Sequence, residues 1–221
     1  MAATTIDPEA FISAVEPLLE SQDLKGIHDL IVHRWTCEQL EELLRSSHTD
    51  AKKVAILAVG LVGRRCCVGE LAHLLHDGDP VVHQLAEHAL WSIWFRCGVP
   101  EARQELLLGT QAMNDRQFDQ AEIHFNRSIE IDPAFAEAYN QRAIGYYLQE
   151  QYDKSIADCR RVVWRMPMHF GAWAGMGHCQ AHANQIEDAI ESYRRALSIN
   201  PRLECVQMAI DELSRRLEQC A

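Results

Sequence analysis

The sequence predicts an all-α protein built as a helical-repeat solenoid, and three observations lead to that prediction. Positions in the C-terminal half recur with a 34-residue step, and positions in the N-terminal half recur with a 31-residue step. Periods of this length are typical of stacked helical units. The 221 residues are 48% hydrophobic and include only 11 Gly and 7 Pro, so few positions would interrupt a helix.

The 34-residue step separates Pro133, Pro167 and Pro201. It also relates three further sets of positions, namely Ala121, Ser155 and Ala189; Phe125, Cys159 and Tyr193; and Ser128, Val162 and Ala196. This period and its helix-turn-helix layout resemble the tetratricopeptide repeat family over residues 102–201. The resemblance implies three units, each with two helices, in which the second helix ends at the proline.

Small residues at Gly109, Ala143 and Gly177 would let the two helices of each unit approach closely. The first unit departs from the family pattern at Glu105, where an aromatic residue is usual. Residues 202–219 predict one more amphipathic helix that covers the open end of the array, as such arrays require. Its apolar residues are Leu203, Met208, Ile210, Leu213 and Leu217.

In the N-terminal half, Leu40, Leu43 and Leu44 recur as Leu71, Leu74 and Leu75. Each block predicts a leucine-rich helix, a polar turn and a second apolar helix. In the second block Asp79 suits the helix cap and Pro80 the first helical position. The two blocks, over about 36–97, resemble the short HEAT-like repeats of phycobilin lyases and deoxyhypusine hydroxylase. The pattern of residues 8–34 predicts two further helices, which form either a degenerate third unit or a cap.

We therefore expect a HEAT-like domain over residues 1–99 and a tetratricopeptide domain with its capping helix over residues 100–221. The joint at 97–101 contains Gly98 and Pro100 and is too short for a flexible tether. The sequence thus favours two arrays stacked into one continuous curved body.

The net charge is −11, and both halves are acidic. An acidic protein repels phosphate backbones, so we expect no nucleic-acid or membrane partner, and a basic or apolar partner rather than an acidic one. The N-terminus does not resemble a signal peptide, and no apolar stretch reaches the ~20 residues that span a bilayer. These features predict a cytoplasmic protein. Its eight cysteines are then expected to be structural thiols, with a disulfide framework as the alternative.

The densest polar cluster in the sequence comprises His73, His76, His83, Glu87 and His88. Spacings of three and four residues place such pairs on one helix face, where they could bind zinc or iron. The favoured interpretation is that these histidines are solvated or hydrogen-bonded on the open face and hold no metal. The resemblance to the hydroxylase implies an iron-binding His-Glu pair, but Gln84-Leu85 and Lys53-Val54 occupy the matching positions. We found no phosphate loop, nucleophile elbow or H-E-x-x-H motif and expect no catalytic residue or cofactor.

The tetratricopeptide resemblance implies a binding groove lined by the first helix of each unit. The candidate partner-binding residues are Arg103, Leu106, Thr110, Asn140, Gln141, Ile144, Tyr147, His178 and His182. Family members that bind the acidic C-terminus of heat-shock chaperones use a clamp of Lys, Asn, Asn, Lys and Arg. The matching positions here are Leu106, Thr110, Gln141, Gly171 and Gly175, so carboxylate capture is not expected.

The apolar anchors of this groove would be Leu106, Ile144 and Tyr147, which suit an amphipathic helix or an extended apolar peptide. The alternative is that Ile144 and Tyr147 pack within the array. Trp91 is a second candidate, either as a binding anchor or as a seal together with Trp94. The favoured function is a non-catalytic adaptor. The alternatives are a metal-dependent or lyase-like accessory enzyme that uses the histidine cluster, and a subunit that associates with its own kind.

Overall fold

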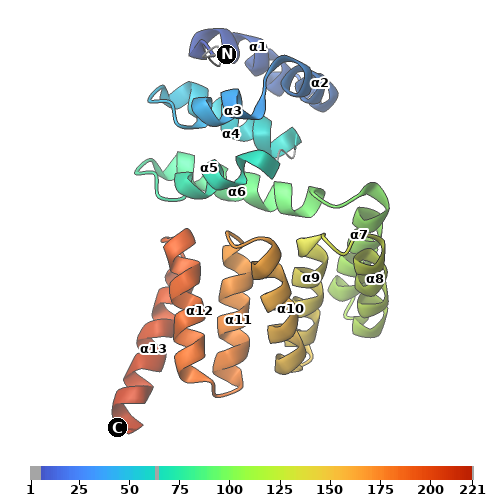
Figure 1. Cartoon of the computed structure of the whole chain (residues 1–221), viewed down its shortest axis with the longest axis vertical. Helices are drawn as coiled ribbons and strands as arrows, with labels where there is room; N and C mark the ends of the chain where they lie inside the picture. Colours follow the sequence, from blue (N-terminus) through green and yellow to red (C-terminus); the bar gives the residue numbers. More distant parts are fainter. Residues whose placement is uncertain (1–5, 63–64, 221) are drawn as a thin grey trace. The chain divides into compact units, whose positions relative to one another are not determined.

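The computed structural model describes residues 6–62 and 65–220. Within these residues every regular element is helical, as the sequence predicts (Figure 1). The chain divides into two compact units, residues 1–97 and 98–221. None of the helices in the described ranges combines the length and the apolar character that a bilayer span needs.

The N-terminal unit contains six α-helices and a short 3₁₀ helix among its described residues. They are α1 (Pro8–Glu20), α2 (Leu24–Arg34), α3 (Cys37–Leu44), α4 (Thr49–Val62), η1 (Arg65–Cys67), α5 (Val68–Leu74) and α6 (Pro80–Arg96). The pairs α3/α4 and α5/α6 correspond to the two blocks of the 31-residue repeat. The Asp79 side chain accepts a hydrogen bond from the Val81 amide at the start of α6, where Pro80 is the first residue. The predicted cap is confirmed.

Helices α4 and α6 approach each other at Gly60. A Cβ atom at this position would lie 2.9 Å from the Ala89 Cβ, so only glycine allows this backbone separation. Apolar residues at helical spacing on α6 predict one buried face, and Val82, Ala86, Ala89, Leu90 and Ile93 are buried. Leu85, which the same spacing places on that face, is only half-buried. The polar turns of this unit are held by ion pairs, including Lys52 with Asp77 and Lys53 with Asp79.

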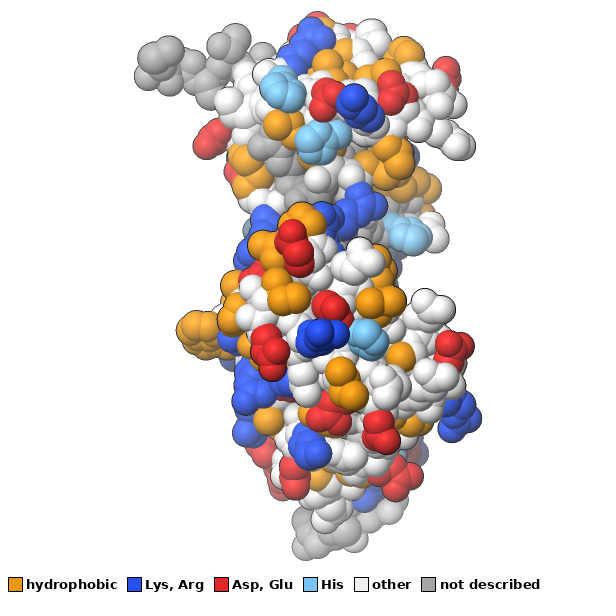
Figure 2. Space-filling view, turned by 90° about the vertical axis from the view of Figure 1, so that its right-hand side faces the viewer, with side chains coloured by type: hydrophobic (Ala, Val, Ile, Leu, Met, Phe, Trp, Pro, Cys, Tyr) orange, Lys and Arg blue, Asp and Glu red, His pale blue; other side chains and the backbone are white. Residues whose placement is uncertain are grey.

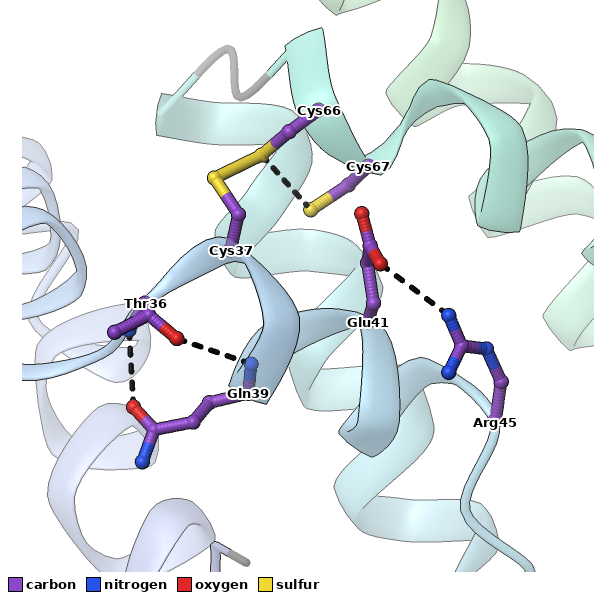
Figure 3. The surroundings of a disulfide bond; sticks show 7 residues. All are labelled: Thr36, Cys37, Gln39, Glu41, Arg45, Cys66 and Cys67. Atoms are coloured by element: carbon purple, nitrogen blue, oxygen red, sulfur yellow. Dashed lines mark hydrogen bonds and ion pairs between the residues drawn. A yellow bond between two sulfur atoms is a disulfide. The ribbon is translucent and has the colours of Figure 1, made fainter. Parts of the chain in front are cut away.

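One disulfide joins Cys37, the first residue of α3, to Cys66 in η1 (Figure 3). The prediction that all cysteines are thiols is therefore wrong for these two. They are 29 residues apart and meet only because the helices pack, so no short spacing signalled the bond. Five further cysteines among the described residues form no disulfide, namely Cys67, Cys97, Cys159, Cys179 and Cys205. Burial raises the pKa of Cys159 to about 12 and also raises that of Cys179, so both stay protonated, unreactive core groups.

The C-terminal unit consists of three helix pairs and a terminal helix. Its elements are α7 (Pro100–Asn114), α8 (Phe118–Ile131), α9 (Ala136–Leu148), α10 (Tyr152–Arg165), α11 (Phe170–His182), α12 (Ile186–Ile199) and α13 (Glu204–Cys220). From α8 to α13, each helix packs on the one before it in the chain (Figure 1). Helices α8, α10 and α12 begin at positions 118, 152 and 186, which reproduces the 34-residue step of the sequence.

The turn inside each pair has one backbone form. Arg116, Glu150 and Asn184, which are related by the same repeat step, have φ of 59°, 60° and 58°. In each turn the left-handed residue ends the first helix, because its amide and the next one bond back to carbonyls of the last helical turn. Gln22, between α1 and α2, has the same conformation with φ 55°. The sequence did not signal this, since none of the four residues is the glycine that usually occupies such a position.

In each pair, a small residue on the first helix packs against a larger residue on the second. A Cβ atom at Gly109 would lie 2.5 Å from the Phe125 ring, and one at Gly177 would lie 2.6 Å from the Tyr193 ring. In the middle pair the small residue is Ala143, and the facing position holds the smaller Cys159 in the same core cluster. The two sizes therefore compensate, as close packing requires.

Helix α13 covers the end of the array. Val206, Ile210 and Leu213 are buried against α12, and Leu203 and Leu217 pack at the edge of the same cluster. The predicted cap is thus present, with one correction. Met208 was expected to cover the end of the array, but its side chain is 69% exposed because it lies on the outer face of the helix.

The size compensation predicts opposite effects for two glycines of α11. Gly177→Ala should lower the stability of the C-terminal unit by about 1–3 kcal/mol, because the buried Tyr193 ring cannot move aside. Gly175→Ala is the matched control, since its Cβ would meet only Cys159 Sγ, at 3.9 Å. This change should raise stability by up to about 1 kcal/mol through helix propensity. Denaturant unfolding measures both, and equal effects would contradict the packing.

The disulfide predicts a local loss of stability in the N-terminal unit. Cys66→Ser should destabilise α3 to α5 by about 3–4 kcal/mol, because reopening a loop of this length restores entropy to the unfolded chain. Hydrogen exchange should show faster exchange in these helices and no change in α7 to α12. Cys205→Ser, at an exposed free thiol, is the control. Unchanged exchange in α3 to α5 would count against the disulfide.

Candidate partner-binding surface

The predicted groove residues fall into two groups in the structure. Leu106, Asn140 and Gln141 are buried, with exposed fractions of 1%, 4% and 7%. They do not present side chains to a partner, and the prediction is corrected for these three. The position of each residue within the repeat identified the helix that carries it, but not how deeply its side chain is buried. The remaining members, all half-buried or exposed, are Arg103, Thr110, Ile144, Tyr147, His178 and His182.

Asn140 and Gln141 are buried because they hydrogen-bond to a carboxylate. Glu137, with no exposed surface, accepts bonds from Asn140 Nδ2 at 3.0 Å and Gln141 Nε2 at 2.6 Å. His169 Nε2 lies 3.0 Å from the other carboxylate oxygen, while its Nδ1 accepts from the Ala172 amide. This arrangement assigns the proton to Nε2, which donates to Glu137. The network joins α9 to the start of α11, and sequence reasoning missed it.

Tyr147, Tyr152 and His182 form an aromatic cluster that remains accessible. The Tyr152 ring stacks on His182 with centroids 5.0 Å apart and planes at 9°. Tyr147 contacts His182 edge-on at 5.7 Å, and its hydroxyl lies 3.4 Å from His182 Nε2. Desolvation and the Glu150 carboxylate raise the pKa of Tyr152, so its hydroxyl stays neutral. Exposed Ile144 and Leu148 lie on α9 with Tyr147.

We call the exposed part of the groove the α9–α11 surface, defined by Ile144, Tyr147, Leu148, Tyr152 and His182. It offers aliphatic and aromatic groups and carries no lysine or arginine. Such a surface binds apolar side chains by burying area and offers one imidazole and two hydroxyl groups for hydrogen bonds.

His178 lies beside this surface but points into the array. Its Nδ1 accepts a hydrogen bond from the Tyr193 hydroxyl at 2.7 Å. Burial, together with the neighbouring His182, lowers the pKa of His178. Burial also raises the pKa of Tyr193, so both groups of the pair are neutral at physiological pH.

Glu105, the departure in the first unit, is explained by an ion-pair network. Its carboxylate lies 2.7 Å from His124 Nδ1 and 3.9 Å from Arg127. Both partners come from α8, the second helix of the same pair. Polar contacts here replace the aromatic packing that is usual at this position.

The histidine cluster of the N-terminal unit does not converge on one point. His73, His76 and His88 are exposed, whereas His83 is buried with Nδ1 2.7 Å from the Leu75 carbonyl oxygen. His83 was expected on the open face, which is wrong, because it caps the carbonyl at the end of α5. No three His, Cys, Asp or Glu side chains within the described ranges are placed to hold a metal ion. Trp91 is half-buried and packs edge-on against buried Trp94, with centroids 4.9 Å apart.

Residues 171–203, which cover α11 and α12, match the family model of the tetratricopeptide repeat. Protein bimA of Emericella nidulans is 30% identical over 94 residues, which are 42% of this chain and 12% of that protein. Anaphase-promoting complex subunit 3 of Schizosaccharomyces pombe is 30% identical over 97 residues, 42% of this chain and 15% of that protein. A TPR repeat-containing protein of Rhizobium etli is 26% identical over 48% of this chain and 52% of its own length.

Among solved structures, the first TPR of Spaghetti (RPAP3) bound to the HSP90 peptide SRMEEVD has a TM-score of 0.53 and 19% identity. It covers 53% of this chain and 94% of its own. The Sgt2 TPR domain from Aspergillus fumigatus also has a TM-score of 0.53 and 19% identity, over 56% and 83% of the two chains. These matches show the fold. With the 34-residue step, they support a tetratricopeptide fold for the C-terminal unit.

The lowered pKa of His178 predicts that the folded protein loses stability as the pH falls. In the unfolded chain this imidazole takes up its proton near its ordinary pKa of about 6.5, while the folded chain resists protonation. The stability contribution is therefore complete above that pH and is lost as pH falls below it. Between about pH 7.5 and pH 5, His178→Asn should lose less unfolding free energy than wild type, as measured by urea titration. Parallel losses in the two proteins would rule out this linkage.

Proposed function

We propose that this protein is a non-catalytic adaptor that holds a protein or peptide on the α9–α11 surface. The observation that carries the proposal is an accessible apolar and aromatic surface on a tetratricopeptide fold. Ile144 is 38% and Leu148 51% exposed on α9, next to the Tyr147, Tyr152 and His182 cluster. Burial raises the pKa of Cys159 and Cys179, so these two thiols are poor nucleophiles and lend no support to a catalytic function.

The ligand class proposed here is an amphipathic helix or an extended apolar peptide. One structural neighbour holds an HSP90 peptide, SRMEEVD, which is acidic at its end. The positions of a carboxylate clamp in this chain are occupied by Leu106, Thr110, Gln141, Gly171 and Gly175, none of which is cationic. Aromatic anchors at the accessible surface suit apolar side chains, and the net charge of −11 favours a basic over an acidic ligand there.

Three further proposals concern the N-terminal repeats, the location of the protein in the cell and its self-association. The pairs α3/α4 and α5/α6 support HEAT-like repeats in the N-terminal unit, because each follows the 31-residue step. A cytoplasmic location is supported by the reduced thiols of Cys159, Cys179 and Cys205, and the Cys37–Cys66 disulfide is the exception. Self-association through the same α9–α11 surface is the alternative to a foreign partner, and sizing across a concentration range separates the two.

The test is a comparison of partner retention by matched variants. Ile144→Glu and Tyr147→Ala should each weaken binding of a partner recovered by the wild-type chain about tenfold or more, because a charge or a lost ring removes an apolar anchor. Ile123→Glu places the same charge at an exposed isoleucine of α8 and is the control. Circular dichroism verifies the fold of each. A partner retained by Ile144→Glu and lost by Ile123→Glu would overturn the location.

A further inference from the structure

Trp164 is the most exposed of the large hydrophobic residues described, at 79%. It lies near the end of α10, where the repeat places Glu130 in the preceding unit and Ser198 in the following one. The packing of the repeat therefore does not need an aromatic side chain at this position. An indole left largely in water at a position that is otherwise polar is a candidate binding anchor.

Arg165 contacts two aromatic rings. Its guanidinium carbon lies 5.3 Å from the Trp164 centroid and 4.5 Å from that of Tyr139. Its Nε donates to the Pro133 carbonyl at 2.9 Å, and its other nitrogens bond Arg161 and Tyr139. The donors of Arg165 are thus engaged within the protein. Its cation lies within cation–π distance of the indole, which favours one orientation of the ring.

Two neighbouring cations of α10, Arg160 and Arg161, are exposed. Arg160 is exposed and has no ion pair within the part of the chain described. Arg161 is 52% exposed and shares buried Asp158 with Arg142, which makes a bidentate pair to the same carboxylate. From position 159 to 168 the chain carries three arginines and no acidic residue. Lys and Arg side chains gather beside a projecting apolar group at one edge of the C-terminal unit (Figure 2).

We propose that Trp164, Arg160, Arg161 and exposed Met168 form a second docking surface, the α10 patch, which binds an acidic protein segment that carries an apolar side chain. The local charge is positive in a molecule whose net charge is −11, so the patch selects a ligand of opposite sign. A long nucleic acid is disfavoured, because it would also meet the acidic remainder of the unit.

This surface is distinct from the α9–α11 surface. Tyr152, the first residue of α10, belongs to that surface, whereas Trp164 is near the other end of the same helix. At about 1.5 Å per residue the two lie roughly 18 Å apart along the helix. The adaptor would then hold two ligands of different chemistry. An apolar ligand would bind near the start of α10, and an acidic ligand would bind near its end.

The experiment selects peptides from a random display library on the full chain. Peptides retained by wild type but not by Trp164→Ala should be enriched in Asp and Glu around an apolar residue. Such peptides should bind Arg160→Glu/Arg161→Glu about tenfold or more weakly and should lose affinity as salt rises. The matched control is Arg194→Glu/Arg195→Glu, which makes the same charge change at the equivalent positions of α12, where no tryptophan follows.

The outcomes separate this proposal from the adaptor function of the α9–α11 surface. Acidic peptides that still bind Ile144→Glu, bind the α12 control normally and fail on Trp164→Ala would establish the α10 patch. The proposal is overturned if the wild-type chain enriches no acidic peptide, or if both arginine variants lose binding equally. Tighter binding of a single-stranded oligonucleotide than of the selected peptides would overturn the choice of occupant. Trp164→Ala should unfold like wild type, since its side chain is exposed.

Discussion

The C-terminal unit depends on how closely the two helices of each repeat can approach. The separation is set by a small residue on the first helix and the ring or thiol that faces it, and the pairs Gly109–Phe125 and Gly177–Tyr193 leave no room for a Cβ atom. The middle pair reaches the same result with Ala143 and Cys159. Protein interiors are close-packed, so the distance between the two helices of a pair constrains where the following turn lies. It thereby also constrains the positions of the surface residues on these helices.

Hydrogen-bonded networks of polar side chains connect the helices in addition to this packing. Glu137 is fully buried, yet its carboxylate oxygens are bonded by Asn140, Gln141 and His169. A buried charge with such partners is tolerated, whereas an unpaired one would cost several kcal/mol. Arg142 has the same role in the second pair, through a bidentate bond to Asp158 and a bond to Asn126. The first network joins α9 to the start of α11, and the second joins α8, α9 and α10.

The α10 patch shows that the net charge of the chain does not set the charge of every local site. A chain of −11 still gathers Arg160, Arg161 and Arg165 within one turn and a half of helix, around an exposed indole. Screening confines the effect of distant carboxylates to about a Debye length, so a ligand senses chiefly the side chains that it touches. The two surfaces on α10 and its neighbours therefore differ in chemistry although they belong to one unit.

The sequence by itself determined the all-α class, the helix pairs and their 34-residue step, because periodic apolar positions and prolines are local signals. It also located the helices that carry the α9–α11 surface, with Ile144, Tyr147 and His182 among the accessible residues. Only the tertiary structure decided which residues are deep. Leu106 and His83 proved buried and Met208 exposed, because depth depends on the neighbouring helix and not on phase alone.

The tertiary structure alone also decided the contacts between distant residues. The Cys37–Cys66 bond and the Glu137–His169 pair join positions 29 and 32 residues apart, and no spacing rule marks either pair. The left-handed turns at Arg116 and Glu150 were equally hidden, since these residue types do not favour that conformation. Local patterns specify where helices begin and end, whereas contacts across helices depend on packing geometry that the completed fold imposes.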